Sequence, residues 1–188
     1  MTPEVMAFVR SALPGDLVRG RDVLEVGSRD VNGSPRHYLK SLSPASYIGV
    51  DAVDGDGVDL VLQAEGLEAH FGADRFGVVV STEMLEHAED WRTALLGMMA
   101  VAAPGGVLVL TTRSPGFDRH EWPGDYWRFT TADLAAALDG WIGVVSVPDP
   151  YYPGAFASAR KPEPWDRARA AGRLESVLPS PAPEEETP

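Results

Sequence analysis

Short apolar runs alternate with longer amphipathic segments along most of the chain. Five runs rich in Val, Leu and Ile have the length and composition of buried strands: 23–26, 46–50, 58–62, 76–80 and 107–110. Three segments place apolar side chains at helical spacing: 3–13, 34–42 and 89–103. Strands that alternate with helices in this order predict an α/β fold, a Rossmann-like, doubly wound and mostly parallel sheet with helices on both faces.

The pattern changes after the fifth apolar run. A long irregular stretch, 112–129, leads to a helix predicted over 131–139, whose start at Thr130 and Asp133 resembles a capping box. The last two predicted strands are 142–147 and 155–160. They complete a seven-stranded sheet with a late antiparallel hairpin strand.

The length of 188 residues fits one domain. We expect this domain over residues 1–163, including the short N-terminal helix 3–13, with residues 164–178 as an additional, exposed helix. Residues 179–188 carry four Pro, three Glu and no large apolar side chain. Such a segment cannot recover the entropy of ordering, so we expect a disordered, solvated tail.

Charge and composition exclude several classes of partner. The chain has 28 acidic and 16 basic residues, a formal charge of −12. This surface repels phosphate backbones, so duplex DNA or long RNA is not an expected partner. No apolar stretch is long enough to span a membrane. The absence of Cys rules out disulfides and thiolate chemistry and fits a cytoplasmic protein.

Two residues that follow predicted strands are candidates for ligand binding. Gly27 ends the first strand, where a glycine lets a ligand lie against the backbone, although glycine is also common in ordinary turns. Asp51 ends the second strand, where a carboxylate can accept the hydrogen bonds of a ribose diol. Asp51 could instead cap its own acidic loop. Arg29 and Val31 interrupt the glycine pattern of dinucleotide-binding loops, which weakens a nicotinamide interpretation.

Four motifs occur in order and with fitting spacing: Leu24-Glu-Val-Gly27, Gly49-Val-Asp51, Ser81-Thr-Glu-Met-Leu-Glu-His87 and Ala103-Pro-Gly-Gly106. Together they resemble the class I S-adenosylmethionine-dependent methyltransferases, of the small single-domain, type 11-like kind. The resemblance covers about residues 20–161. The loop from Ser28 to Gly33 departs from the family's usual Gly-x-Gly and resembles a subset with Val-Asn-Gly-Ser there.

The resemblance implies S-adenosylmethionine as cofactor and S-adenosylhomocysteine as product. It implies that Glu25 and Gly27 line the amino-acid end of the cofactor, that Asp51 binds the ribose and that Ser81 lies on the sulfonium side. Gln63 and Ala64 would meet the adenine. Two neighbours, Ser28 and Ala52, are also expected to bind the cofactor.

A cluster of acidic and histidine residues has two interpretations. In some methyltransferases that this chain resembles, a triplet like Glu83, Glu86 and His87 binds a divalent metal together with a later His, here His120. Oxygen and nitrogen ligands suit Mg²⁺ or Mn²⁺. Alternatively, these side chains only orient the helix start and the loop. The same triplet is frequent in relatives without metal, so the second interpretation is the favoured one.

The stretch 112–130 is unusually rich in aromatic and charged residues, and long loops of this kind are usually functional. Its expected acceptor-binding residues are Arg113, Asp125, Tyr126 and Arg128. His120 is the candidate general base, because an imidazole titrates near neutral pH. The aromatic rings could also simply pack the loop onto the sheet.

These observations predict an enzyme that moves a methyl group from S-adenosylmethionine to an oxygen or nitrogen atom of a small molecule, such as a sugar or secondary metabolite. A regulatory module that binds the cofactor without catalysis, a metal-assisted O-methyltransferase and a nicotinamide-dependent reductase are the alternatives. The acceptor and the oligomeric state are not indicated by the sequence.

Overall fold

The fold is built on one seven-stranded sheet. The computed structural model describes residues 1–120 and 124–184. The strands follow the order β3-β2-β1-β4-β5-β8-β7 across the sheet. Their bounds are β1 Asp22–Val26, β2 Ser46–Asp51, β3 Leu60–Val61, β4 Phe76–Thr82, β5 Ala102–Arg113, β7 Ile142–Pro148 and β8 Gly154–Arg160. Strands β1 to β5 pair in parallel, whereas β8 is antiparallel to both of its neighbours. The predicted doubly wound α/β fold is confirmed.

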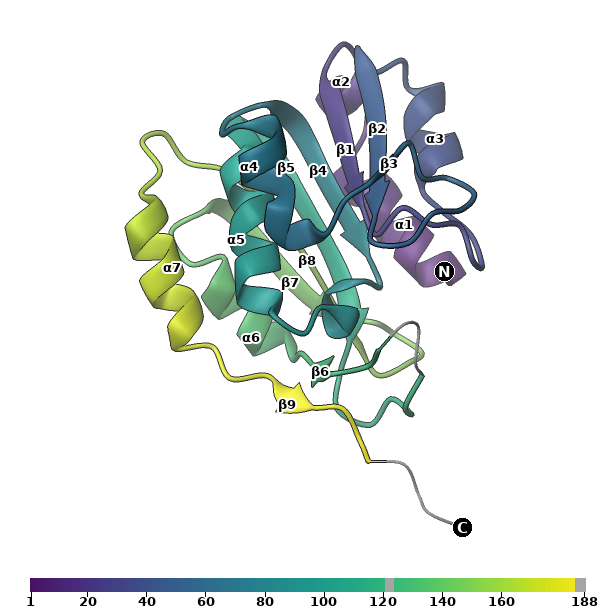
Figure 1. Cartoon of the computed structure of the whole chain (residues 1–188), viewed down its shortest axis with the longest axis vertical. Coiled ribbons are helices and arrows are strands. Elements are labelled where there is room, and N and C mark those ends of the chain that lie inside the picture. The colour runs from purple at the N-terminus through teal and green to yellow at the C-terminus, as the bar shows by residue number, and fades with distance from the viewer. Residues whose placement is uncertain (121–123, 185–188) are drawn as a thin grey trace.

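Helices cover both faces of the sheet (Figure 1). One face carries α1 Pro3–Ala12, α2 Gly15–Val18 and α3 Arg36–Ser41. The other carries α4 Leu67–Phe71, α5 Trp91–Val101, α6 Thr131–Ala137 and α7 Arg167–Glu175. Two single-turn 3₁₀ helices, η1 Ala64–Gly66 and η2 Leu85–His87, follow β3 and β4. The capping box expected at Thr130 and Asp133 begins α6.

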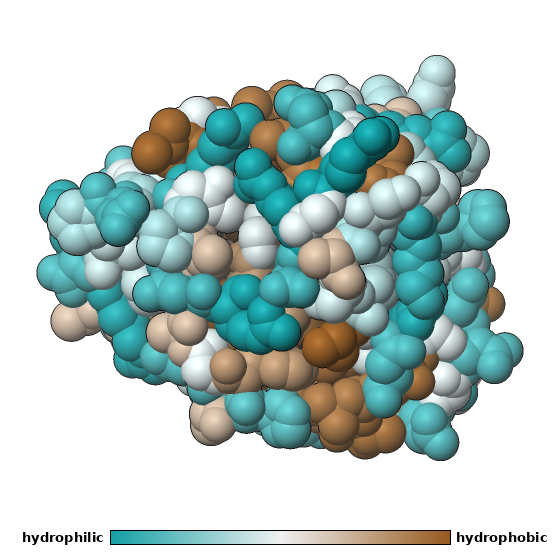
Figure 2. Space-filling view, turned by 90° about the horizontal axis from the view of Figure 1, so that it is seen from above, coloured by the Kyte–Doolittle hydropathy of each residue, from teal (hydrophilic) through white to brown (hydrophobic). Residues whose placement is uncertain are grey.

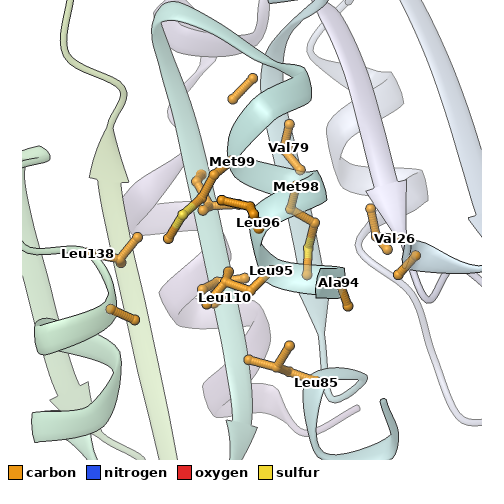
Figure 3. Packing of buried hydrophobic residues seen from close by; sticks show 14 of the residues in the cluster. Val26, Val79, Leu85, Ala94, Leu95, Leu96, Met98, Met99, Leu110 and Leu138 are labelled. Carbon is orange, nitrogen blue, oxygen red and sulfur yellow. The ribbon is translucent and has the colours of Figure 1, made fainter. Parts of the chain in front are cut away.

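Helix α5 is the centre of the larger core. Only Arg92 and Thr93 of its residues are not buried, because the helix lies between the sheet and the neighbouring α4 and α7. Figure 3 shows Met98 and Leu95 of this helix beside Val79 of β4 and Leu110 of β5. An all-round apolar helix is expected where packing surrounds it.

Two boundaries differ from the sequence prediction for local reasons. Strand β5 begins at Ala102, five residues early, because Ala102 pairs with Phe76 and the following glycine-containing turn bulges out of register. Strand β3 is only two residues long. Asp59, which precedes it, donates its amide to the Gly49 carbonyl at 2.8 Å, and its carboxylate accepts from the Arg36 guanidinium and the Gly49 amide.

The C-terminal region contains the helix predicted within 164–178, as α7, but this helix and residues 179–184 are more closely attached than the exposed helix and solvated tail predicted there. Ala170 and Leu174 of α7 are buried against the main core. Ser180–Pro181 form a short strand, β9, that pairs with β6, Trp127–Arg128. Backbone hydrogen bonds order this segment, which apolar patterning does not reveal. Residues 185–188 of the predicted tail lie outside the described residues.

The edge where the parallel strands begin is polar. Figure 2, seen from above Figure 1, shows hydrophilic residues spread across this end of the molecule, with apolar patches toward its rim. The Arg75–Asp22 and Lys161–Asp74 ion pairs belong to this end. Among the described residues, none of the helices is long and apolar enough to cross a membrane.

Candidate functional site

A cavity of about 310 Å³ lies at the opposite edge, beyond the carboxyl ends of the parallel strands. Parallel sheets place ligands there, near the point where the strand order reverses. Here the order reverses between β1 and β4. The lining residues come from the ends of β1, β2, β4 and β5, from the loop after β1, from Met1 and from the loop 114–130 after β5.

Gly27 forms the turn that opens the cavity. Its φ is +77°, in the left-handed region, and a Cβ there would lie 2.5 Å from Cβ and Cγ of Met84. A larger residue would therefore clash with the segment after β4 as well as strain the backbone. The glycine brings the ends of β1 and β4 together around the cavity.

Glu25 points from β1 into this region but is almost fully buried. Its two carboxylate oxygens accept hydrogen bonds from Ser34 Oγ, at 2.8 Å, and from Tyr47 Oη, at 2.7 Å. Burial raises the pKa of Glu25 to about 7, and these two hydrogen bonds only partly offset the effect. A cation that enters the cavity would favour the ionised form.

Asp51, at the end of β2, is held by backbone amides. Its Oδ1 accepts from the Val53 amide at 2.9 Å, and its Oδ2 accepts from the Arg29 amide at 3.1 Å. Each carboxylate oxygen has a second lone pair, so both can still accept a hydroxyl proton from a ligand. The two amides fix the orientation of the carboxylate toward the cavity.

Glu83 and Arg113 form an ion pair in the cavity wall. Glu83 has φ +55°, an uncommon backbone conformation for a residue other than glycine. The Arg113 guanidinium lies over the Phe117 ring, 4.2 Å from its centre. Burial and the neighbouring Glu86 carboxylate raise the pKa of Glu83.

Two histidines and a glutamate converge beside this pair. One ligand atom each from Glu86, His87 and His120 lies within 4.8 Å of the other two. Glu86 is fully buried and accepts a hydrogen bond from Thr112 Oγ1 at 2.7 Å. His120 Nδ1 lies 3.4 Å from Asp125 Oδ2, and Nε2 lies 3.9 Å from Glu86 Oε1. Burial and the nearby His87 lower the pKa of His120.

Residues 2–140 match the model of a family described as "Methyltransferase domain". The chain belongs to this methyltransferase family. The resemblance to class I S-adenosylmethionine-dependent methyltransferases that its motifs indicate is thereby confirmed. A search of curated proteins finds no match.

Solved structures share the fold of this methyltransferase. The 1,6-didemethyltoxoflavin-N1-methyltransferase of Burkholderia thailandensis, solved with 1,6-didemethyltoxoflavin and S-adenosylhomocysteine, aligns with a TM-score of 0.61 and 19% identity over 86% of this chain and 78% of that chain. The N-methyltransferase NodS of Bradyrhizobium japonicum gives 0.59 and 18%, covering 85% and 94%. A chain in the Haloferax volcanii complex of the Trm112 methyltransferase activator and a putative methyltransferase gives 0.64 and 16%, covering 87% and 90%.

The expected cofactor residues of the methyltransferase divide into two groups. Glu25, Gly27 and Asp51 line the cavity. The residues outside its lining are Ser28, Ala52, Gln63, Ala64 and Ser81. Ser28 and Ser81 are buried behind the wall, and Ala52 is exposed. Gln63 and Ala64 lie at the start of η1, past the end of the short β3.

The expected acceptor residues also fall into two groups, those that line the cavity and those that do not. Arg113 and His120 line the cavity. Asp125 and Arg128 instead form a buried ion pair inside the loop, with Arg128 Nη2 2.6 Å from Asp125 Oδ2. Tyr126 is partly exposed to solvent, outside the lining. Of the four residues considered for a metal site, Glu83 is turned toward Arg113 rather than toward the two histidines.

The cavity is also lined by residues for which the sequence predicted no individual role, among them Asn32, Phe117 and Met84. Asn32 and Phe117 lie within loops that the sequence marks as candidates for binding. Met84 belongs to the motif 81–87, but its position against Gly27, 57 residues away in the sequence, is a tertiary contact that the motif does not reveal.

Proposed function

We propose that this methyltransferase transfers the methyl group of S-adenosylmethionine to an oxygen or nitrogen atom of a small molecule. The observation that carries the proposal is that Glu25, Gly27 and Asp51, which bear the cofactor motifs, line the same cavity as Arg113 and His120. The candidate cofactor residues and the candidate acceptor residues therefore meet at one cavity. Sugars and secondary metabolites are the acceptor classes that we propose.

The cofactor, when bound, supplies a methyl group already activated by its sulfonium. The chain's own residues bind the cofactor and orient its methyl group. In this proposal Asp51 accepts the hydrogen bonds of the two ribose hydroxyls, and Glu25 ionises against the ammonium group of the cofactor; the amide-held carboxylate of Asp51 and the raised pKa of Glu25 support these roles. The left-handed turn at Gly27 lines the cavity, where the cofactor would lie close to the backbone.

On the acceptor side, the walls of the cavity align the nucleophile and exclude water. Alignment and the exclusion of water supply most of the rate enhancement for an in-line displacement. His120 takes the proton of an alcohol or phenol acceptor. Asp125 stands 3.4 Å from Nδ1, where it orients the ring and stabilises the imidazolium that forms. Phe117 and the stacked Arg113 give a flat acceptor one face to lie against.

Calorimetry with S-adenosylhomocysteine and with NAD tests the cofactor assignment. We expect binding of S-adenosylhomocysteine only, and a loss of at least about tenfold in affinity for Asp51→Ala, the size of one good charge-assisted hydrogen bond. Asp56→Ala, an exposed acid of the same loop, is the matched control and should bind normally. Binding of NAD alone would exclude the proposal.

Screening pools of phenols, amines and sugars for release of S-adenosylhomocysteine then identifies the acceptor. His120→Asn should lower kcat about 10²- to 10⁴-fold on an alcohol or phenol and leave the affinity for S-adenosylhomocysteine unchanged. Cofactor binding without turnover on any pool would favour the regulatory module instead.

A second candidate is metal-assisted O-methylation, which the convergence of Glu86, His87 and His120 specifically favours. Oxygen and imidazole ligands fit Mg²⁺ or Mn²⁺, and a bound ion would lower the pKa of an acceptor hydroxyl. If this is correct, MnCl₂ should raise the Tm of the wild type but not of His87→Ala. Equal Tm values with and without MnCl₂ would exclude it.

A further inference from the structure

The C-terminal strap, residues 176–184, crosses the loop that forms the acceptor wall. Its beginning is anchored on α5, where Arg92 donates hydrogen bonds to the carbonyls of Leu174, at 3.1 Å, and Val177, at 2.9 Å. Val177 is buried in the main core, whereas Leu178 is largely exposed. Pro179 is buried again, so the strap leaves the core after residue 179, and residues 180–184 continue over the surface.

Beyond Leu178 the strap contacts the acceptor loop, residues 114–130, through backbone groups. Ser180–Pro181 pair antiparallel with Trp127–Arg128. The Ala182 amide donates to the Tyr126 carbonyl at 2.8 Å, and the Pro183 carbonyl accepts from Arg119 at 3.2 Å. These contacts fall on both sides of the part of the loop that contains His120.

The described residues of the acceptor loop also contact the rest of the chain directly. Phe129 is buried in the main core and its amide donates to the Arg113 carbonyl at 2.8 Å, and the Ser114 amide donates to the Pro153 carbonyl at 3.1 Å. The Tyr126 amide donates to the Glu86 carbonyl, and Trp127 Nε1 donates to the carbonyls of Ala88 and Glu89. The Arg128 guanidinium binds the carbonyls of Phe117 and Asp118, which ties the loop to itself. Ser114 and Phe129 thus fix the ends of the loop, whereas the strap contacts at 119 and 126–128 lie closer in sequence to His120 and add to the bonds that place Phe117 and His120 in the cavity.

We propose that the C-terminal strap is a positioning element of the acceptor half of the site. It holds the acceptor loop so that His120 keeps its place beside Asp125 and Glu86. The term acceptor rests on the proposed function, but the hold of the strap on the loop does not. Val177 and Pro179 hold the start of the strap by burial, whereas residues 180–184 are not buried and are fastened by hydrogen bonds, so release of residues 180–184 leaves the core intact.

One substitution in the full chain tests whether the strap positions the acceptor loop. Ala182→Pro removes the amide that donates to Tyr126, and Ala182→Ser, which keeps the amide, is the matched control. We measure hydrogen exchange at the amides of residues 117–120 and 124–128 and the NMR signal of the His120 ring. Calorimetry gives the affinity for S-adenosylhomocysteine.

In Ala182→Pro we expect exchange in the loop to be about two- to tenfold faster, the equivalent of one backbone hydrogen bond. We also expect a shifted His120 signal, with Tm and affinity for S-adenosylhomocysteine close to the wild type. Ala182→Ser should match the wild type in every measurement.

Two results would contradict the proposed positioning role of the strap. One is unchanged exchange in the loop, and the other is faster exchange with an unshifted His120 signal. If the wild type fails to bind S-adenosylhomocysteine, the proposed function fails, while the exchange and NMR comparison still decides the role of the strap.

Discussion

Glu25 is a buried carboxyl group in the wall of the cavity. Its carboxyl group is buried under two hydroxyl donors, and its pKa is raised to about 7. Between pH 4.5 and 7 the folded protein therefore keeps a proton that the unfolded chain releases. It follows that the contribution of Glu25 to the free energy of unfolding falls as the pH rises through this window.

Glu25→Gln should remove this pH dependence. At pH 5 Glu25 is neutral and the variant should be as stable as the wild type. At pH 8 the variant should be more stable by about 1–3 kcal/mol, and it should bind S-adenosylhomocysteine more weakly. Thermal unfolding at the two pH values measures the difference. Glu175→Gln, at an exposed position, is the control and should change neither. A stabilisation of equal size at both pH values would contradict the prediction.

At the scale of elements, the sequence predicted most strands and helices because apolar periodicity is local. The sequence also predicted which candidate residues lie beyond the ends of the strands, and three of them, Gly27, Asp51 and His120, line one cavity. The cavity contact of Met84 and the strand β9 were missed for a physical reason. Both depend on partners distant in sequence, and β9 is held by backbone groups, which apolar patterning does not reveal. Likewise, η1 and the buried face of α7 depend on packing against α5.

The junction between β1 and β4 can be probed by adding one methyl group. Gly27→Ala should destabilise the protein by about 2–5 kcal/mol, because a left-handed φ and the clash with Met84 add together. Gly20→Ala has a similar φ of +69° and no atom within 4 Å of the added Cβ, so it isolates the backbone cost of about 1–2 kcal/mol. Urea unfolding of both variants gives the difference. Equal losses would show that the contact with Met84 is not restrictive.

At the scale of the whole molecule, acidity and apolar surface are distributed unequally. The formal charge is −12, with a dense acidic stretch from 51 to 90. In contrast, β7 forms the end of the sheet and carries no charged residue. Its side chains Ile142, Val145 and Val147 are 57%, 46% and 37% exposed. Unpaired backbone groups and β-branched side chains on an edge strand favour pairing with another chain.

The uncharged edge of β7 has a consequence for the behaviour of concentrated solutions. Repulsion between two chains of charge −12 opposes contact at low ionic strength, where its range is about 30 Å at 0.01 M salt, and falls to about 3 Å at 1 M. Light scattering should therefore show single molecules in dilute buffer and growing self-association as NaCl is added. Val145→Lys places a charge on the edge and should keep the molecules apart throughout the titration. The colloidal stability of this protein would then be governed by a single strand.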